Sequence, residues 1–138
     1  MSTSSLQLKK LLWVGPLTVL SAIIGVLIVR ILAVTILRPN PAPPGLGWIF
    51  PSILTFVFCT GAVLVFALVG RLSKNPIRVY LIISSIFLAI SLLPDITVAS
   101  APIPGADWPY AITLMIMHVV AGVITVSMLI KLTTAKNN

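Results

Sequence analysis

Four long runs of apolar residues, separated by short segments rich in proline, glycine or basic residues, make up most of this 138-residue chain. A helix needs about 20 apolar residues to cross the hydrocarbon core of a bilayer, and it leaves no backbone polar group unpaired there. Apolar side chains encircle each run, which indicates surroundings of lipid or other apolar helices. The pattern predicts an all-α fold, a four-helix transmembrane bundle with spans at about residues 11–37, 48–70, 77–93 and 109–130.

The predicted spans differ in length. At 1.5 Å per residue the first span exceeds the core thickness of about 30 Å, so it must tilt or protrude. The third is short and is expected to stop at Pro94, because proline lacks a backbone N–H. Short connections favour antiparallel pairing of spans one and two, and of spans three and four. The small residues of Ser21-x-x-x-Gly25 suit close helix contact. One membrane domain then covers residues 11–132, between cytoplasmic tails of residues 1–10 and 133–138.

Composition agrees with a membrane location. The chain is 59% hydrophobic and only 8% charged, with a mean hydropathy of +1.18, whereas soluble domains carry about 25% charged residues. The net charge of +7 arises from basic residues at the ends of the apolar runs, which favours membrane lipids over nucleic acid as partners. A homo-oligomer or a membrane-protein partner is also compatible with this composition.

The distribution of basic residues predicts the orientation. Seven basic residues border one side of the predicted bundle, and Arg38 alone lies in the loops on the other side; the seven are Lys9, Lys10, Arg71, Lys74, Arg78, Lys131 and Lys136. By the positive-inside rule, both termini are expected in the cytoplasm and the protein in the inner (plasma) membrane. Trp13, Trp48 and Trp108 stand near the ends of spans, where tryptophan anchors a helix at the membrane interface.

A partial repeat relates the two halves. Pro44-Gly45-x-x-Trp48 and Pro104-Gly105-x-x-Trp108 are offset by 60 residues, and Arg71 aligns with Lys131 in the same register. The offset suggests two similar helical hairpins related by duplication. Alternatively, any four-span protein places turn residues, tryptophan and positive charge at such points.

Three ionisable residues lie within or beside the spans, where such groups are costly. Arg30 lies about 30 Å along the helix from Lys10, and Asp95 about 26 Å from Arg78, so both reach a similar depth. We therefore predict a structural ion pair between Arg30 and Asp95. Alternatively, Arg30 extends its guanidinium to the outer headgroups.

His118, the only histidine, falls near mid-membrane in the last span. Three roles are open to it: a structural hydrogen bond between helices, a proton-relay or ligand-binding group in a cavity, or an axial ligand to haem or a metal. Ser84 and Ser91 share a helical face with Asp95, and this face either packs against a helix or lines a polar cavity. His118, Ser84 and Ser91 are thus the candidate ligand-binding residues.

Catalytic sets are missing from the sequence. It contains no nucleophile–base–acid combination, no glycine-rich phosphate loop and no pair of carboxylates, and its single cysteine, Cys59, lies in an apolar run. We expect no catalytic residues, no metal site and no cofactor. The sequence favours a non-enzymatic accessory or structural protein; the alternative is a small transporter or ligand-binding protein with a cavity near His118.

Short motifs in the second half resemble a known family. A basic loop leads to a span that ends in Ser91-Leu92-x-Pro94, and the last span carries Met117-His118. This order resembles a bacterial family of small four-helix integral membrane proteins classed as a domain of unknown function, in which an arginine in span one looks similar to Arg30. The resemblance implies a four-helix fold and no activity.

Overall fold

The structure, a computed structural model, describes residues 7–39 and 43–134. Its elements in chain order are η1 (Leu8–Lys10), α1 (Leu11–Leu37), η2 (Pro44–Leu46), α2 (Ile49–Leu72), α3 (Pro76–Ser91), α4 (Leu93–Val98) and α5 (Trp108–Thr133). Four helical units are long and apolar enough to cross a membrane: Leu8–Leu37, Ile49–Leu72, Pro76–Val98 and Trp108–Thr133. The predicted four-helix transmembrane bundle is confirmed. Most of the first tail and of the last tail, residues 1–6 and 135–138, lies outside the described residues.

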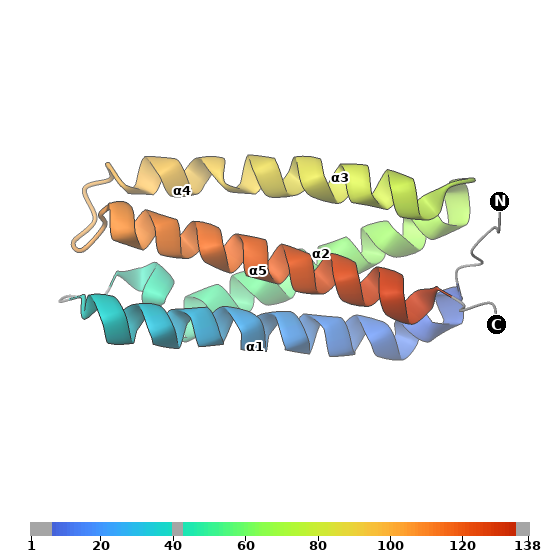
Figure 1. The fold of residues 1–138 in the computed structure, drawn as a ribbon, viewed down its shortest axis with the longest axis horizontal. Helices are drawn as coiled ribbons and strands as arrows, with labels where there is room; N and C mark the ends of the chain where they lie inside the picture. Colours follow the sequence, from blue (N-terminus) through green and yellow to red (C-terminus); the bar gives the residue numbers. More distant parts are fainter. Residues whose placement is uncertain (1–6, 40–42, 135–138) are drawn as a thin grey trace.

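Helix α5 occupies the middle of the bundle. It packs extensively against α1 on one side and contacts α3, α4 and α2 on others, while α1 also packs against α2 (Figure 1). The expected antiparallel neighbours are present, but the most extensive contact joins the first and last spans. Gly25 permits this approach, because an added Cβ there would lie 2.5 Å from Ile124 Cδ1 and 3.2 Å from Val120 Cγ1 on α5.

The two ends of the bundle differ in what they carry. At the end that we call the terminal end, the Gln7 backbone N–H donates to the Thr133 carbonyl over 2.9 Å, so the start of η1 and the end of α5 lie together (Figure 1). The opposite end, here called the loop end, carries η2, α4 and the connection between α4 and α5.

The outer surface is apolar nearly throughout, as a lipid-facing surface must be. Leu12 is 86% exposed, Leu72 77% and Ile36 75%. In water such a surface would be an aggregation liability, whereas lipid solvates it. Within the described residues the buried polar side chains are Asp95 and threonines, and threonine suits close helix packing in membranes.

Three small clusters form the interior. Val14, Phe66, Val69, Tyr80 and Leu129 pack at the terminal end. Val19, Ala22 and Cys59 pack in the middle. Val26, Leu46, Tyr110 and Met117 pack at the loop end. The last cluster includes a residue of η2, so this turn is folded back onto the helices.

The third span extends further than predicted. Helix α3 ends at Ser91, but the chain continues as α4 to Val98, and the unit Pro76–Val98 has the length of a full span. Proline is tolerated in the first turn of a helix, where its missing N–H has no partner to lose. Pro94 occupies this position in α4, and Leu92 keeps right-handed backbone angles of φ −80° and ψ −17°. The expected stop at Pro94 is therefore only a break in the hydrogen-bond ladder.

The two Pro-Gly segments of the partial repeat have different conformations. Gly45 is buried in η2, whereas Gly105 is exposed and has a φ of 79°. The predicted duplication has no support from these two turns and stays a prediction.

Candidate functional site beside the break between α3 and α4

The helix break positions a carboxylate inside the bundle. Because α4 restarts immediately after Leu92, Asp95 falls on its first turn and faces α5. The side chain is buried, with 5% of the residue exposed. A carboxylate so placed needs a polar partner, since leaving it unpaired in an apolar interior is costly.

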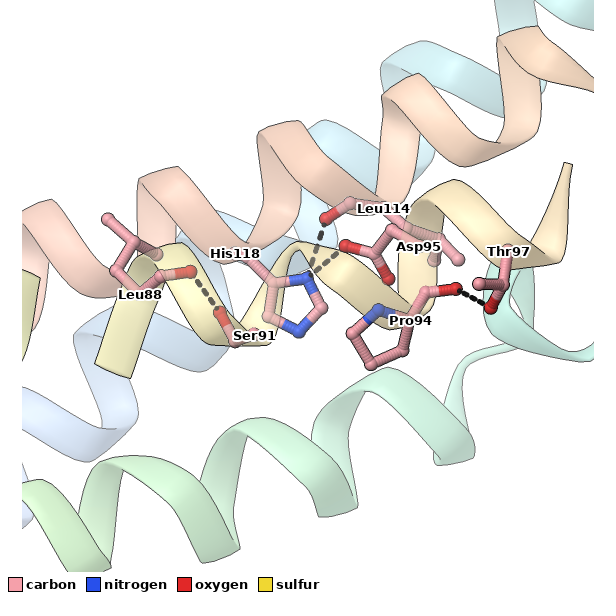
Figure 2. A network of polar contacts seen from close by, with 7 residues as sticks. All are labelled: Leu88, Ser91, Pro94, Asp95, Thr97, Leu114 and His118. Atoms are coloured by element: carbon pink, nitrogen blue, oxygen red, sulfur yellow. Dashed lines mark hydrogen bonds and ion pairs between the residues drawn. The ribbon is translucent and has the colours of Figure 1, made fainter. Parts of the chain in front are cut away.

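His118 of α5 supplies that partner. Its Nδ1 lies 2.8 Å from Asp95 Oδ2 and 3.0 Å from the carbonyl oxygen of Leu114, one turn earlier in the same helix (Figure 2). A carbonyl oxygen only accepts, so Nδ1 carries the hydrogen. The hydrogen is directed at Leu114, because Oδ2 has no well-directed hydrogen bond despite the short distance. The carboxylate is thus a close electrostatic partner of the ring, and the carbonyl fixes its orientation.

The second ring nitrogen of His118, Nε2, is not engaged by the residues that hold Nδ1. Nε2 points away from Asp95 and Leu114 in Figure 2, and the His118 side chain is 35% exposed. Among the residues that the structure describes, none forms a hydrogen bond with Nε2. With Nδ1 protonated, Nε2 of a neutral imidazole is a hydrogen-bond acceptor.

The two candidate serines differ from His118 in their surroundings. Ser91 Oγ donates to the Leu88 carbonyl of its own helix over 2.7 Å, so its hydroxyl serves the turn before the break (Figure 2). Ser84 is half-buried and lies two turns closer to the terminal end. The structure therefore brings Ser91 to the neighbourhood of Asp95 and His118, and leaves Ser84 apart from them.

The predicted ion pair between Arg30 and Asp95 is absent from the structure. Arg30 Nε donates to the Leu46 carbonyl of η2 over 2.9 Å, and its guanidinium carbon lies 3.7 Å from the centre of the Trp48 ring. Within the described residues, the one basic side chain in close contact with a carboxylate is His118, which contacts Asp95. The prediction was wrong because depth alone does not decide which helices are neighbours: α5 lies between α1 and α4.

A small apolar cavity opens beside His118, in the half of the bundle nearer the loop end. Its volume is about 80 Å³, and residues of α1, α2 and α5 line it, together with Gly45. Its lining is apolar apart from His118, Thr55 and Cys59. Cys59 Sγ lies 3.2 Å from Thr125 Oγ1, so the cysteine already has a polar partner.

A larger apolar groove lies on the opposite half of the bundle. It runs between α1 and α2 near the terminal end, has a volume of about 400 Å³ and includes Gly15, Pro16, Phe56, Thr60 and Val63. The groove is open at the surface of the bundle, and Thr60 is its one polar lining residue among those described.

Two features at the loop end were not predicted from the sequence. Tyr110 Oη accepts a hydrogen bond from the Gly45 backbone N–H over 3.1 Å, which holds η2 against α5. A Cβ at Gly45 would overlap Tyr110 Oη, so only glycine fits. Asp107 Oδ1 accepts from the Tyr110 N–H over 2.8 Å and caps α5. The sequence Asp-Trp-Pro before an apolar run is a recognisable helix start, but nothing in it points to Gly45.

The tryptophans proposed as interface anchors all lie at the ends of spans. Trp13 is near the terminal end and Trp48 and Trp108 are at the loop end, each 53% to 58% exposed. These positions suit the amphipathic indole at a membrane interface. The anchoring role stays a prediction.

Comparison with known proteins yields a single family. The profile described as "Family of unknown function (DUF6069)" matches residues 17–135 of the chain. No curated protein and no solved structure matches the chain.

Proposed function

The chain belongs to a family of unknown function, DUF6069, and we propose from its own geometry that it binds a lipid-soluble molecule carrying a hydroxyl group. The observation that carries this proposal is the free Nε2 of His118 beside an apolar cavity. Asp95 and the Leu114 carbonyl hold the ring by its other nitrogen, so Nε2 is presented in a constant orientation. Proteins commonly orient a ligand-binding histidine in this way, through contacts of its other ring nitrogen with a carboxylate or a backbone carbonyl.

The size of the cavity restricts what it can hold. Pockets for drug-sized ligands measure about 300 to 1,000 Å³, whereas this one has about 80 Å³. It accommodates one end of a molecule, and the remainder lies in the surrounding lipid. An apolar chain with a polar head suits this arrangement, because the lining offers few polar atoms besides His118.

The chemistry of Nε2 selects the head group. Nε2 accepts a hydrogen bond from a hydroxyl when the ring is neutral and donates one to the hydroxyl oxygen when the ring is protonated, so a hydroxyl group suits either state. An alkane fills the same space without this hydrogen bond, and in an apolar site the missing bond decides specificity.

Charge distribution supports an orientation for the site. Six of the seven basic residues on the predicted cytoplasmic side belong to the described part, at the terminal end or in the connection between α2 and α3; they are Lys9, Lys10, Arg71, Lys74, Arg78 and Lys131. We propose both termini in the cytoplasm and the inner membrane as the location, which places the cavity in the outer half of the bilayer.

The unique histidine provides a direct test. Protein labelled with ¹⁵N-histidine and purified without a histidine tag has only the two ring signals of His118. Titration of nanodiscs with hexadecanol should shift the Nε2 signal and leave Nδ1 nearly unchanged, whereas hexadecane should shift neither. Equal responses to the alcohol and the alkane would refute the proposal.

Two substitutions of alanine by leucine form a matched pair, one inside the cavity and one outside it. Ala121 lines the cavity, so Ala121→Leu should fill it and abolish the shift. Ala89 is exposed on α3, so Ala89→Leu should leave the shift intact. A shift that survives Ala121→Leu unchanged would place the alcohol outside the cavity.

An accessory or structural role is the second candidate. The groove of about 400 Å³ between α1 and α2 favours it, because an apolar side of a neighbouring transmembrane helix would fill this space. Native mass spectrometry directly from membranes tests it: a complex with another copy or another protein supports this role, and a monomer with lipids alone opposes it.

A further inference from the structure

Arg30 is held in an unusual setting at the loop end of α1. Its Nε donates to the Leu46 carbonyl over 2.9 Å, and the flat guanidinium lies on the Trp48 ring, with the guanidinium carbon 3.7 Å from the ring centre. Arginine over the face of tryptophan is a favourable cation–π contact. These two contacts fix the plane of the guanidinium and use one of its five N–H donors.

The remaining donors of Arg30 have no partner among the described residues. Within the described residues, the terminal nitrogens Nη1 and Nη2 form no hydrogen bond, and neither is among the fully buried polar atoms that lack a partner. Asp95 is engaged with His118, with α5 between it and Arg30. The guanidinium therefore carries a full positive charge and four N–H donors that no described residue accepts, and no carboxylate of the described residues forms an ion pair with it.

Its depth places Arg30 near the level of the lipid headgroups. Arg30 lies 19 residues after Leu11, about 28 Å along the helix, close to the thickness of the hydrocarbon core of about 30 Å. Trp48, the residue type that marks the membrane interface, is at the same level because it contacts the guanidinium. On the stretch of α1 before Arg30, toward the bilayer centre, Ile24 and Ile28 are about half exposed and apolar.

We propose that Arg30 binds the phosphate group of an anionic lipid in the leaflet at the loop end. The guanidinium fork matches a phosphate in a bidentate manner, and such charge-assisted bonds are stronger than neutral ones. Leu46 and Trp48 hold the fork in place. Ile24 and Ile28, on the bilayer-centre side of Arg30, offer an apolar surface to the acyl chains. This site is independent of the cavity beside His118, since it uses other residues and another head group.

The test is lipid binding to delipidated protein in detergent, followed by native mass spectrometry. Phosphatidylglycerol should bind the wild type, and diacylglycerol, which lacks the phosphate, should bind about tenfold more weakly. Arg30→Gln should weaken phosphatidylglycerol binding by about tenfold and should leave diacylglycerol unchanged. Arg38, exposed at the same end of α1, is the matched control, and Arg38→Gln should retain the wild-type affinity.

Two further arms keep the result decisive. Trp48→Leu removes the aromatic ring beneath the guanidinium and leaves the hydrogen bond to Leu46 in place. This variant should weaken phosphatidylglycerol binding about threefold. It tests the proposal even if Arg30→Gln does not fold. Equal loss in the Arg30 and Arg38 variants, or equal binding of diacylglycerol, would overturn it. Displacement of the lipid by millimolar inorganic phosphate would assign the site to free phosphate and overturn the lipid assignment.

Discussion

Replacing Asp95 by asparagine tests whether the contact between α4 and α5 stabilises the bundle. The substitution retains the shape of the side chain and removes its charge. Asp95 is buried, and its Oδ2 lies 2.8 Å from His118 Nδ1. The substitution therefore removes the electrostatic attraction between the carboxylate and the ring. His118 is not orphaned, because Nδ1 keeps the Leu114 carbonyl at 3.0 Å.

The retained hydrogen bond sets the expected magnitude. Removing one member of a buried ion pair in a soluble protein costs about 3 to 5 kcal/mol when the other is left unpaired. Polar contacts between membrane helices average about 0.6 and reach about 1.7 kcal/mol. Because His118 retains a partner, we expect Asp95→Asn to lower the free energy of unfolding by about 1 to 2 kcal/mol.

The measurement is equilibrium unfolding in mixed micelles with increasing sodium dodecyl sulfate, followed by circular dichroism. Asp107→Asn is the matched control, because asparagine caps a helix as well as aspartate and should cost less than about 0.5 kcal/mol. A double-mutant cycle with His118→Phe should give a coupling of about 1 kcal/mol between positions 95 and 118. A coupling below about 0.3 kcal/mol would show that the close approach contributes nothing to stability and would refute the reasoning.

Two further predictions concern how the helices and the loop approach one another. Gly25→Ala should destabilise the bundle by about 1 to 2 kcal/mol, because the added Cβ would crowd Ile124. Gly61→Ala, with no atom within 4 Å of the added Cβ, should be neutral or stabilise α2 by about 0.5 kcal/mol. Equal effects of the two substitutions in the same unfolding assay would contradict close packing at Gly25. Tyr110→Phe leaves the Gly45 N–H without its acceptor and should cost about 1 to 2 kcal/mol, with faster hydrogen exchange at Gly45; unchanged exchange there would show that η2 is held by other contacts.

The span count followed directly from the sequence. Lipid admits only backbone that pairs its own polar groups, so long apolar runs allow one local structure. The same reasoning placed the tryptophans at span ends and the basic residues at one end of the bundle. Helix α1 covers the range of the first predicted span, and α2 and α5 start and stop within three residues of theirs.

The third span shows a limit of local rules. Pro94 predicts a stop because proline cannot continue a hydrogen-bond ladder. Whether a helix restarts after the break depends on what the following turn can pack against, and α4 packs against α5. This restart is what brings Asp95 into the interior.

The partners of the ionisable residues were decided by the tertiary structure alone. The sequence identifies Asp95, Arg30 and His118 as costly groups that need a partner, and helical rise gives their approximate depths. The pairing depends on neighbour relationships: α5, which carries His118, separates α1 from α4, and η2 folds back to meet Arg30. In a soluble helix a polar face reveals which side is buried, but in lipid both sides are apolar. The sequence by itself therefore determined how many helices cross the membrane, and only packing decided which faces meet.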